Sequence, residues 1–212
     1  MKKLLLAMLV LSIAGCAQLG GKDSTETLAR HKCRRTLGKM TIDGRLQEIS
    51  WKAARPVGQF VNYDGTPEIR RPTSAWMLWD DEALYVAFQC VDTDLYSTIK
   101  HRDGPLYNQD VVEVFFMEQS GDQGHFVEYE VNPIGTEFDM YYVKPFVGIQ
   151  GWTSEGFKSA ARYDGSVNKP GNEDVGYTVE MKIPFADLYI EGRGPKTPEA
   201  GSTMRINLYR ID

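Results

Sequence analysis

Short runs that alternate apolar and polar residues constrain the fold of this 212-residue chain more than any other feature. Residues 84–91, 125–132, 177–185 and 202–212 place β-branched, aromatic or aliphatic side chains at every second position. This is the period of a half-buried β-strand. Asp-Gly, Asn-Pro, Gly-Thr and Pro-Gly pairs interrupt the runs and are typical of turns. The pattern predicts an all-β domain.

The run DVVEVFF at residues 110–116 has the clearest two-faced pattern. Val112, Val114 and Phe116 share one face, and Glu113 falls on the other. Because an unpaired carboxylate is costly to bury, we expect the Glu113 face to be a groove floor or a solvated surface. Tyr107 precedes this run in a Gly-Pro loop and is expected to overhang the same face. An aromatic plane beside a fixed carboxylate suits a sugar, although an ordinary surface glutamate beside a core tyrosine gives the same pattern.

Polar second faces recur on the runs 125–132 and 202–212. If these strands lie beside 110–116, their side chains form a grid of donors and acceptors that can bind several hydroxyls. The alternative is a solvated sheet surface whose ion pairs contribute little. The residues of this predicted grid are Glu113, Glu130, Asn132, Arg205 and Asn207.

Residues 73–79 and 84–91 flank an acidic turn and predict a hairpin. The alternation places Cys90 on the core face of the second strand, and Trp51 is expected to be buried after one helical turn. Cys33 and Cys90 can pair in an oxidising compartment, but two cysteines are too few for a metal knuckle or a disulfide framework.

Residues 1–15 predict a lipoprotein signal peptide, with two lysines and an apolar run too short to span a membrane. Ile13-Ala14-Gly15-Cys16 resembles the bacterial lipobox, which implies cleavage before Cys16 and lipidation of its thiol. Ala17 after the cysteine favours the outer membrane, so we expect a cell-envelope protein on the periplasmic or surface face. A plain secretory signal with a nearby cleavage site is the alternative. Residues 16–32 predict a flexible tether, which leaves 33–212 as one domain.

The charge balance limits the class of partner. Twenty-nine acidic and 24 basic residues give a net charge of −5, and removing Lys2 and Lys3 with the signal peptide takes it to −7. An acidic chain argues against nucleic acid as the main partner.

Five segments follow one another along residues 33–212. They are TIDGRLQEISW from Thr41, LWDDEALYVAFQCVDTDL from Leu78, HRDGPLYNQDVVEVFF from His101, YEVNPIGT from Tyr129 and GYTVEMKIPFADL from Gly176. In this order they resemble the family 9 carbohydrate-binding modules, and the lipoprotein members above all. The resemblance implies an antiparallel, jelly-roll-like β-sandwich that binds sugars without catalysis and holds structural calcium.

The resemblance also implies the site residues. Tyr107 matches a stacking aromatic that is usually Trp in the family, and Glu113 matches a carboxylate that bonds sugar hydroxyls. Further hydroxyl contacts are expected among Glu128, Glu130 and Asn132. The family has a second aromatic after the last motif, where this sequence stops at Asp212. Either the domain lacks its final C-terminal strand, or Trp152 or another loop aromatic takes that place.

Calcium takes hard oxygen ligands, and acidic residues flank the predicted hairpin. No EF-hand spacing is present, so the ligands stay unassigned and the site stays an expectation; no cofactor is required for sugar binding itself. The flanking acids are Asp80, Asp81, Glu82, Asp92 and Asp94.

These observations predict a lipid-anchored, non-catalytic module that holds an oligo- or polysaccharide at the cell envelope and assists glycan capture or breakdown. One alternative is a glycoside hydrolase that uses Glu113 and Glu130 as its acid and base. The other is a haem-binding electron-transfer domain of related fold, with axial ligands drawn from residues such as His31, His101 and His125. None of these histidines lies in a C-x-x-C-H motif.

Overall fold

The computed structural model describes residues 29–66, 71–117, 125–171, 173–188 and 198–212. The predicted signal peptide, Cys16 and most of the predicted tether lie outside these residues. Residues 31–212 form one compact unit. No helix in the described segments is long and apolar enough to cross a bilayer.

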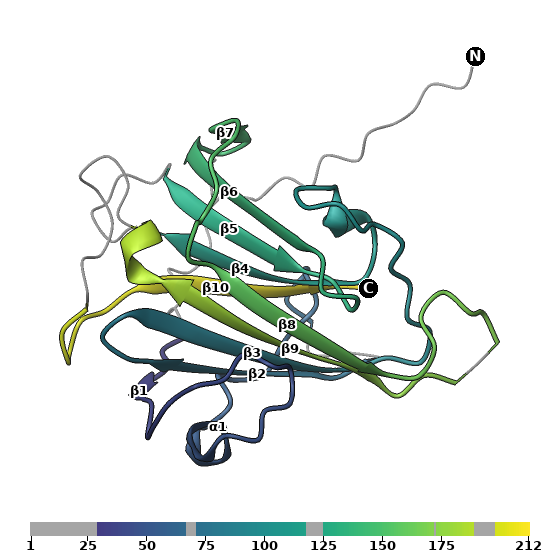
Figure 1. Cartoon of the computed structure of the whole chain (residues 1–212), viewed down its shortest axis with the longest axis horizontal. Helices are drawn as coiled ribbons and strands as arrows, with labels where there is room; N and C mark the ends of the chain where they lie inside the picture. The colour runs from purple at the N-terminus through teal and green to yellow at the C-terminus, as the bar shows by residue number, and fades with distance from the viewer. Residues whose placement is uncertain (1–28, 67–70, 118–124, 172, 189–197) are drawn as a thin grey trace, which may run out of the picture. The chain divides into compact units, whose positions relative to one another are not determined.

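Two five-stranded sheets make up this unit and pack against each other as a β-sandwich (Figure 1). The first sheet has the order β1-β2-β3-β9-β8, with β1 at Arg34–Arg35, β2 at Thr73–Trp79, β3 at Ala83–Val91, β9 at Gly176–Pro184 and β8 at Lys158–Asp164. The second has the order β10-β4-β5-β6-β7, with β10 at Arg205–Ile211, β4 at Val111–Met117, β5 at Phe126–Val131, β6 at Glu137–Lys144 and β7 at Val147–Gly148. Apart from the parallel pair β1 and β2, the neighbouring strands are antiparallel.

The core lies between the sheets and follows the alternation in the sequence. Val112, Val114 and Phe116 of β4 face it, as do alternate residues of β3, β5 and β9. Cys90 is buried in this core, as predicted. Cys33 packs against the same core, and both thiols are free, so no bridge joins them.

The outer face of the first sheet carries a second apolar cluster around Trp51, which lies in the short helix α1 (Ile49–Ala53). Trp51 is 5% exposed, which confirms its predicted burial. Glu180 of β9 holds this layer in place, because its carboxylate accepts hydrogen bonds from the Trp51 indole and from the backbone N–H groups of Asp43 and Gly44. The Asp-Gly turn therefore serves to dock the N-terminal segment on the sheet.

Two connecting elements complete the fold. The 3₁₀ turn η1 (Leu106–Asn108) precedes β4, and η2 (Phe185–Leu188) follows β9. The sequence analysis named no strand at β8, whose sequence KSAARYD lacks an apolar alternation. The structure places β8 at the edge of its sheet, where a strand needs little apolar surface.

Candidate functional site

Three glutamates come together on the outer face of the second sheet. Glu113 of β4 stands directly opposite Glu130 of β5, and Glu128 lies two residues before Glu130. One carboxylate oxygen from each residue lies within 4.8 Å of the others. The predicted adjacency of β10, β4 and β5 and the shared face of Glu113 and Glu130 are confirmed. We call Glu113, Glu128 and Glu130 the glutamate cluster.

The cluster is buried, which corrects the expectation of a groove floor or a solvated surface. The exposed fractions are 5% for Glu113, 8% for Glu128 and 1% for Glu130. The loop before β4 reaches the cluster, since the Tyr107 backbone N–H donates to the Glu130 carboxylate. From β6, the Tyr142 hydroxyl donates to Glu128. Loop packing and aromatic neighbours, which the alternation does not encode, therefore remove these side chains from solvent.

The three glutamates are buried without a cationic partner in the described part of the chain, and this raises their pKa values. Desolvation, and then the neighbouring Glu128, raise the pKa of Glu113 to about 8. Desolvation also raises the pKa of Glu128 and of Glu130, and the other two glutamates add to the effect on Glu130. Among the described residues, no Lys or Arg forms an ion pair with the cluster. The Oε2 of Glu130 is buried without a hydrogen-bond partner.

An aromatic row crosses four strands on the same face. The rings of Phe126 and Tyr142 stack with centroids 4.5 Å apart, and Phe115 lies 6.0 Å from Phe126. Tyr209, opposite Glu113 on β10, meets Phe115 edge-on at 5.3 Å. The sequence analysis did not single out Phe115, Phe126 or Tyr142. Side chains alternate along each strand, so the strand order and register place these three rings on the same face as the glutamates.

Tyr107 lies in η1, and its side chain is 54% exposed. Its backbone N–H reaches the glutamate cluster, its side chain is exposed to a ligand, and its predicted stacking role stays a prediction. Asn132 is 1% exposed. Its amide donates to Ile99 O and accepts from the Thr136 backbone, so the structure gives it a part in holding the turn after β5. Its predicted sugar contact is not tested by these bonds.

Trp152 does not join this face. Its ring lies 6.2 Å from Tyr141, a core residue, and packs, partly buried, against the core between the sheets. Its role as the second stacking aromatic stays a prediction. The tertiary structure turns the loop after β7 inward, and Phe126 and Tyr142 supply aromatic surface on the outer face instead.

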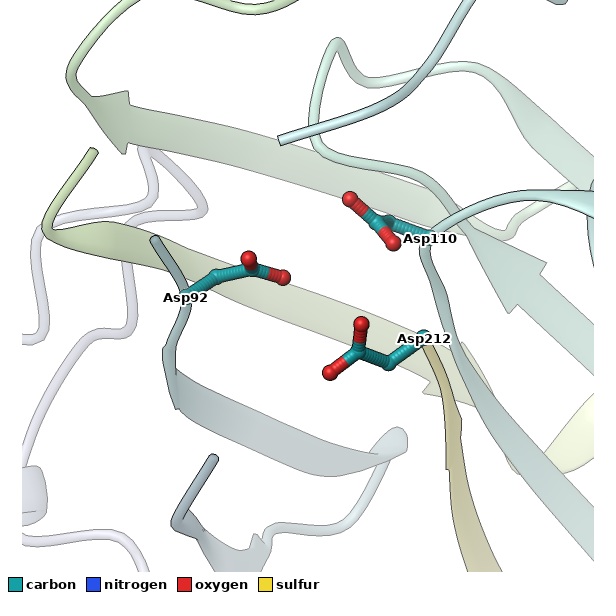
Figure 2. A group of neighbouring side chains, drawn as sticks. All are labelled: Asp92, Asp110 and Asp212. Atoms are coloured by element: carbon teal, nitrogen blue, oxygen red, sulfur yellow. The ribbon is translucent and has the colours of Figure 1, made fainter. Parts of the chain in front are cut away.

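A second acidic group lies where β3, β4 and β10 meet. Figure 2 shows Asp92, Asp110 and Asp212 pointing toward one another, and one oxygen of each lies within 4.8 Å of the others. Two arginines compensate this group. Arg210 contacts Asp92 at 2.6 Å and Asp212 at 3.3 Å, and Arg71 pairs with the same two aspartates. The arrangement is an ion-pair network that joins the two sheets.

The acids that flank the hairpin do not form one calcium site. Asp80, Asp81 and Glu82 lie in the turn between β2 and β3, whereas Asp92 and Asp94 follow the far end of β3. Each turn acid has its own partner: Asp80 accepts from the turn backbone, Asp81 pairs with Arg35 and Glu82 with Lys182. The expectation of structural calcium stays open, and these five residues cannot share an ion.

The face with the glutamate cluster is chemically suited to binding hydroxyl groups. Carboxylates accept hydrogen bonds, protonated carboxyls donate them, and rings offer surface to sugar C–H groups. Glycoside hydrolysis needs two carboxyl groups on opposite sides of the scissile bond, with different protonation states. Here three acids with raised pKa values are gathered at one point of a sheet.

Comparisons with known proteins identify the family and agree with the β-sandwich fold. Residues 42–212 match the family described as carbohydrate family 9 binding domain-like. Two similar structures are of a family 9 carbohydrate-binding module from Caldicellulosiruptor kristjanssonii, in complex with cellotriose and with glucose. Their TM-scores are 0.56 and 0.57 at 20% and 21% identity, covering 83% and 82% of this chain and 74% and 75% of theirs. A putative carbohydrate-binding protein from Bacteroides uniformis has a TM-score of 0.54 at 14% identity, covering 74% of this chain and 70% of its own.

Two curated relatives are parts of much larger proteins. The chain is 28% identical over 174 residues to endo-1,4-beta-xylanase A of Thermoanaerobacterium saccharolyticum and 30% identical over 156 residues to exoglucanase XynX of Acetivibrio thermocellus. The matches cover 81% and 72% of this chain but 12% of each relative. The similarity therefore concerns one segment of each relative and gives no information on any enzymatic activity of this chain.

Proposed function

Because the chain belongs to the carbohydrate family 9 binding domain-like family, we propose that the outer face of its second sheet binds an oligo- or polysaccharide without cleaving it. One observation carries the proposal: the glutamate cluster and the aromatic row lie on the same face of neighbouring strands. The rings supply apolar surface for the sugar, and the carboxyl groups supply hydrogen bonds that fix its orientation.

Glucans are the first ligands to test, because the similar structures from C. kristjanssonii hold cellotriose and glucose. The exposed Tyr107 is proposed to contact the sugar from the loop side, and Glu113 to bond its hydroxyls from the sheet. An ordinary hydrogen bond contributes about 0.5–1.5 kcal/mol net, so the loss of one weakens binding by up to roughly tenfold.

The experiment is calorimetry of the full chain in mild detergent, titrated with cellotriose and with a xylo-oligosaccharide. Glu113→Gln keeps the shape of the side chain and is expected to weaken binding by up to about tenfold, because an NH₂ group, which only donates, replaces one carboxyl oxygen. Asp81→Asn is the matched control, since Asp81 pairs with Arg35 in the hairpin turn of the other sheet and should leave the heat unchanged. Equal heat from wild type and Glu113→Gln would place the sugar elsewhere, and no heat with any glycan would refute the function.

We also propose that this binding takes place at the cell envelope, with a lipid on Cys16 as the anchor. The support is the sequence Ile13-Ala14-Gly15-Cys16 after an apolar run. Metabolic labelling with an alkyne fatty acid is expected to mark the wild-type chain and to leave Cys16→Ser unmarked. Equal labelling of both chains would contradict the anchor and leave the sugar-binding proposal untouched.

A further inference from the structure

The glutamate cluster lacks the compensation that the other acidic group has. Around Asp92, Asp110 and Asp212, two arginines supply positive charge. Around Glu113, Glu128 and Glu130, no described Lys or Arg forms an ion pair, and the hydrogen bonds come from the Tyr107 backbone N–H, from the Tyr142 hydroxyl and from a contact between Glu128 and Glu130. Since buried carboxylates are normally paired or bound to a metal, the cluster needs a further positive partner.

A second observation points to a ligand rather than to shared protons alone. Glu130 is 1% exposed, and its Oε2 is buried with no hydrogen-bond partner. An acidic side chain that is this well enclosed normally has every oxygen satisfied. One oxygen of the Glu130 carboxylate lies within 4.8 Å of one oxygen each from Glu113 and Glu128, so a ligand at this point is within reach of all three residues.

The spacing of the oxygens fits a hard cation. Calcium binds oxygen at about 2.3–2.6 Å, so two ligands on opposite sides of the ion lie roughly 4.6–5.2 Å apart. One oxygen from each glutamate lies within 4.8 Å of the other two, so all three fit on one coordination sphere. Calcium generally takes about six to eight oxygen ligands. The three carboxylates supply only part of this number, and other oxygens must supply the rest.

We propose that Glu113, Glu128 and Glu130 bind a divalent cation, Ca²⁺, at the base of the sugar-binding face. The ion fixes the three side chains in one arrangement. Water and sugar hydroxyls complete its coordination, so sugar binding depends on the ion. This last step rests on the proposed function, whereas the ion site does not.

The first experiment titrates Ca²⁺ into the full chain in mild detergent after chelator treatment, with Mg²⁺ as the comparison, and follows heat and melting temperature. Wild type is expected to bind Ca²⁺ and to melt at a higher temperature with it. Glu130→Gln removes one charged ligand and should weaken Ca²⁺ binding at least about tenfold. The control is Asp212→Asn, the same change in the arginine-compensated group, and it should bind Ca²⁺ like wild type.

Melting temperatures also show whether the Glu130→Gln variant is folded, so a loss of Ca²⁺ binding can be told apart from a loss of the fold. In chelator, Glu130→Gln should melt near wild type, because Gln has the shape of a protonated Glu. In Ca²⁺ wild type should melt above the variant, because only wild type keeps all three charged ligands. Absence of Ca²⁺ heat and of a melting shift in wild type would overturn the ion site. A site abolished by Asp212→Asn and kept in Glu130→Gln would overturn it equally.

Cellotriose titrations with and without Ca²⁺ separate the two proposals. Weaker sugar binding in chelator supports the role of the ion, and unchanged sugar binding overturns that role. Calcium binding to the cluster with no sugar binding under either condition would refute the proposed function and leave the ion site standing.

Discussion

Arg210 joins the two sheets through several side-chain and backbone partners. It projects from β10 and contacts Asp92 after β3, and it donates to the backbone carbonyls of Arg71 and Val91. Its side chain is 6% exposed and that of Asp92 is 0% exposed. A buried ion pair of this kind is costly to break, because the remaining charge is left without a partner.

We predict that Arg210→Ala lowers the free energy of unfolding by about 3–5 kcal/mol, the usual loss when one partner of a buried pair is removed. Chemical denaturation followed by tryptophan fluorescence measures the change. Arg205→Ala, on the same strand with an exposed side chain, is the control and should stay within about 0.5 kcal/mol of wild type. Equal effects of the two substitutions would contradict the role given to Arg210.

Among the strands, β9 depends on a close approach at its first residue. Gly176 pairs with Val91 of β3 and has a φ of +144°. A Cβ atom at this position would lie 2.0 Å from the Cys90 carbonyl oxygen. β9 therefore pairs with β3 in this register only because residue 176 has no side chain.

Gly176→Ala is predicted to destabilise the domain by more than the roughly 1–3 kcal/mol that a strained backbone conformation costs. The control is Gly171→Ala, whose φ of +87° carries similar backbone strain, while its Cβ meets no atom within 4 Å. Thermal melts give the melting temperature of each variant. Gly171→Ala reports backbone strain alone, and Gly176→Ala reports strain together with the clash against the Cys90 carbonyl. A melting temperature of Gly176→Ala at or above that of Gly171→Ala would show that β9 can shift to relieve the contact.

The stability of the whole domain depends on pH through its buried acids. Burial first, and then the nearby Asp92 and Asp212, raise the pKa of Asp110 to about 6, while Arg210 and the Tyr96 backbone N–H oppose the shift. Between pH 4 and pH 6 the native chain therefore holds a proton at Asp110 that the unfolded chain releases. Since the native state binds more protons there, this contribution to the free energy of unfolding falls as pH rises.

Asp110→Asn keeps an oxygen for the Tyr96 N–H and removes the charge. We predict that the variant gains about 1 kcal/mol relative to wild type on going from pH 4 to pH 7, a figure discounted for solvent screening. Denaturation curves at pH 4, 5, 6 and 7 measure the difference between the two chains. A difference that stays constant across the series, or that falls as pH rises, would contradict the assignment.

Local pattern was enough to predict most strands and their faces. Val112, Val114 and Phe116 face the core and Glu113 faces away, because side chains alternate along any strand whatever its neighbours. The hairpin of β2 and β3 and the core position of Cys90 followed from the same rule. Ordered motifs in the sequence also predicted the family to which the chain belongs. The edge strand β8 was missed, because an edge position needs little apolar alternation.

The tertiary structure decided how deeply each polar face is covered and which charges meet. The burial of Glu113, Glu128 and Glu130 depends on the η1 loop and on the aromatic row, whose packing no local pattern specifies. Arg210 finds Asp92 across 118 residues of sequence, whereas the glutamates, on adjacent strands, find no cation among the described side chains. Alternation is a property of each backbone segment alone, but desolvation and charge compensation depend on contacts between distant segments.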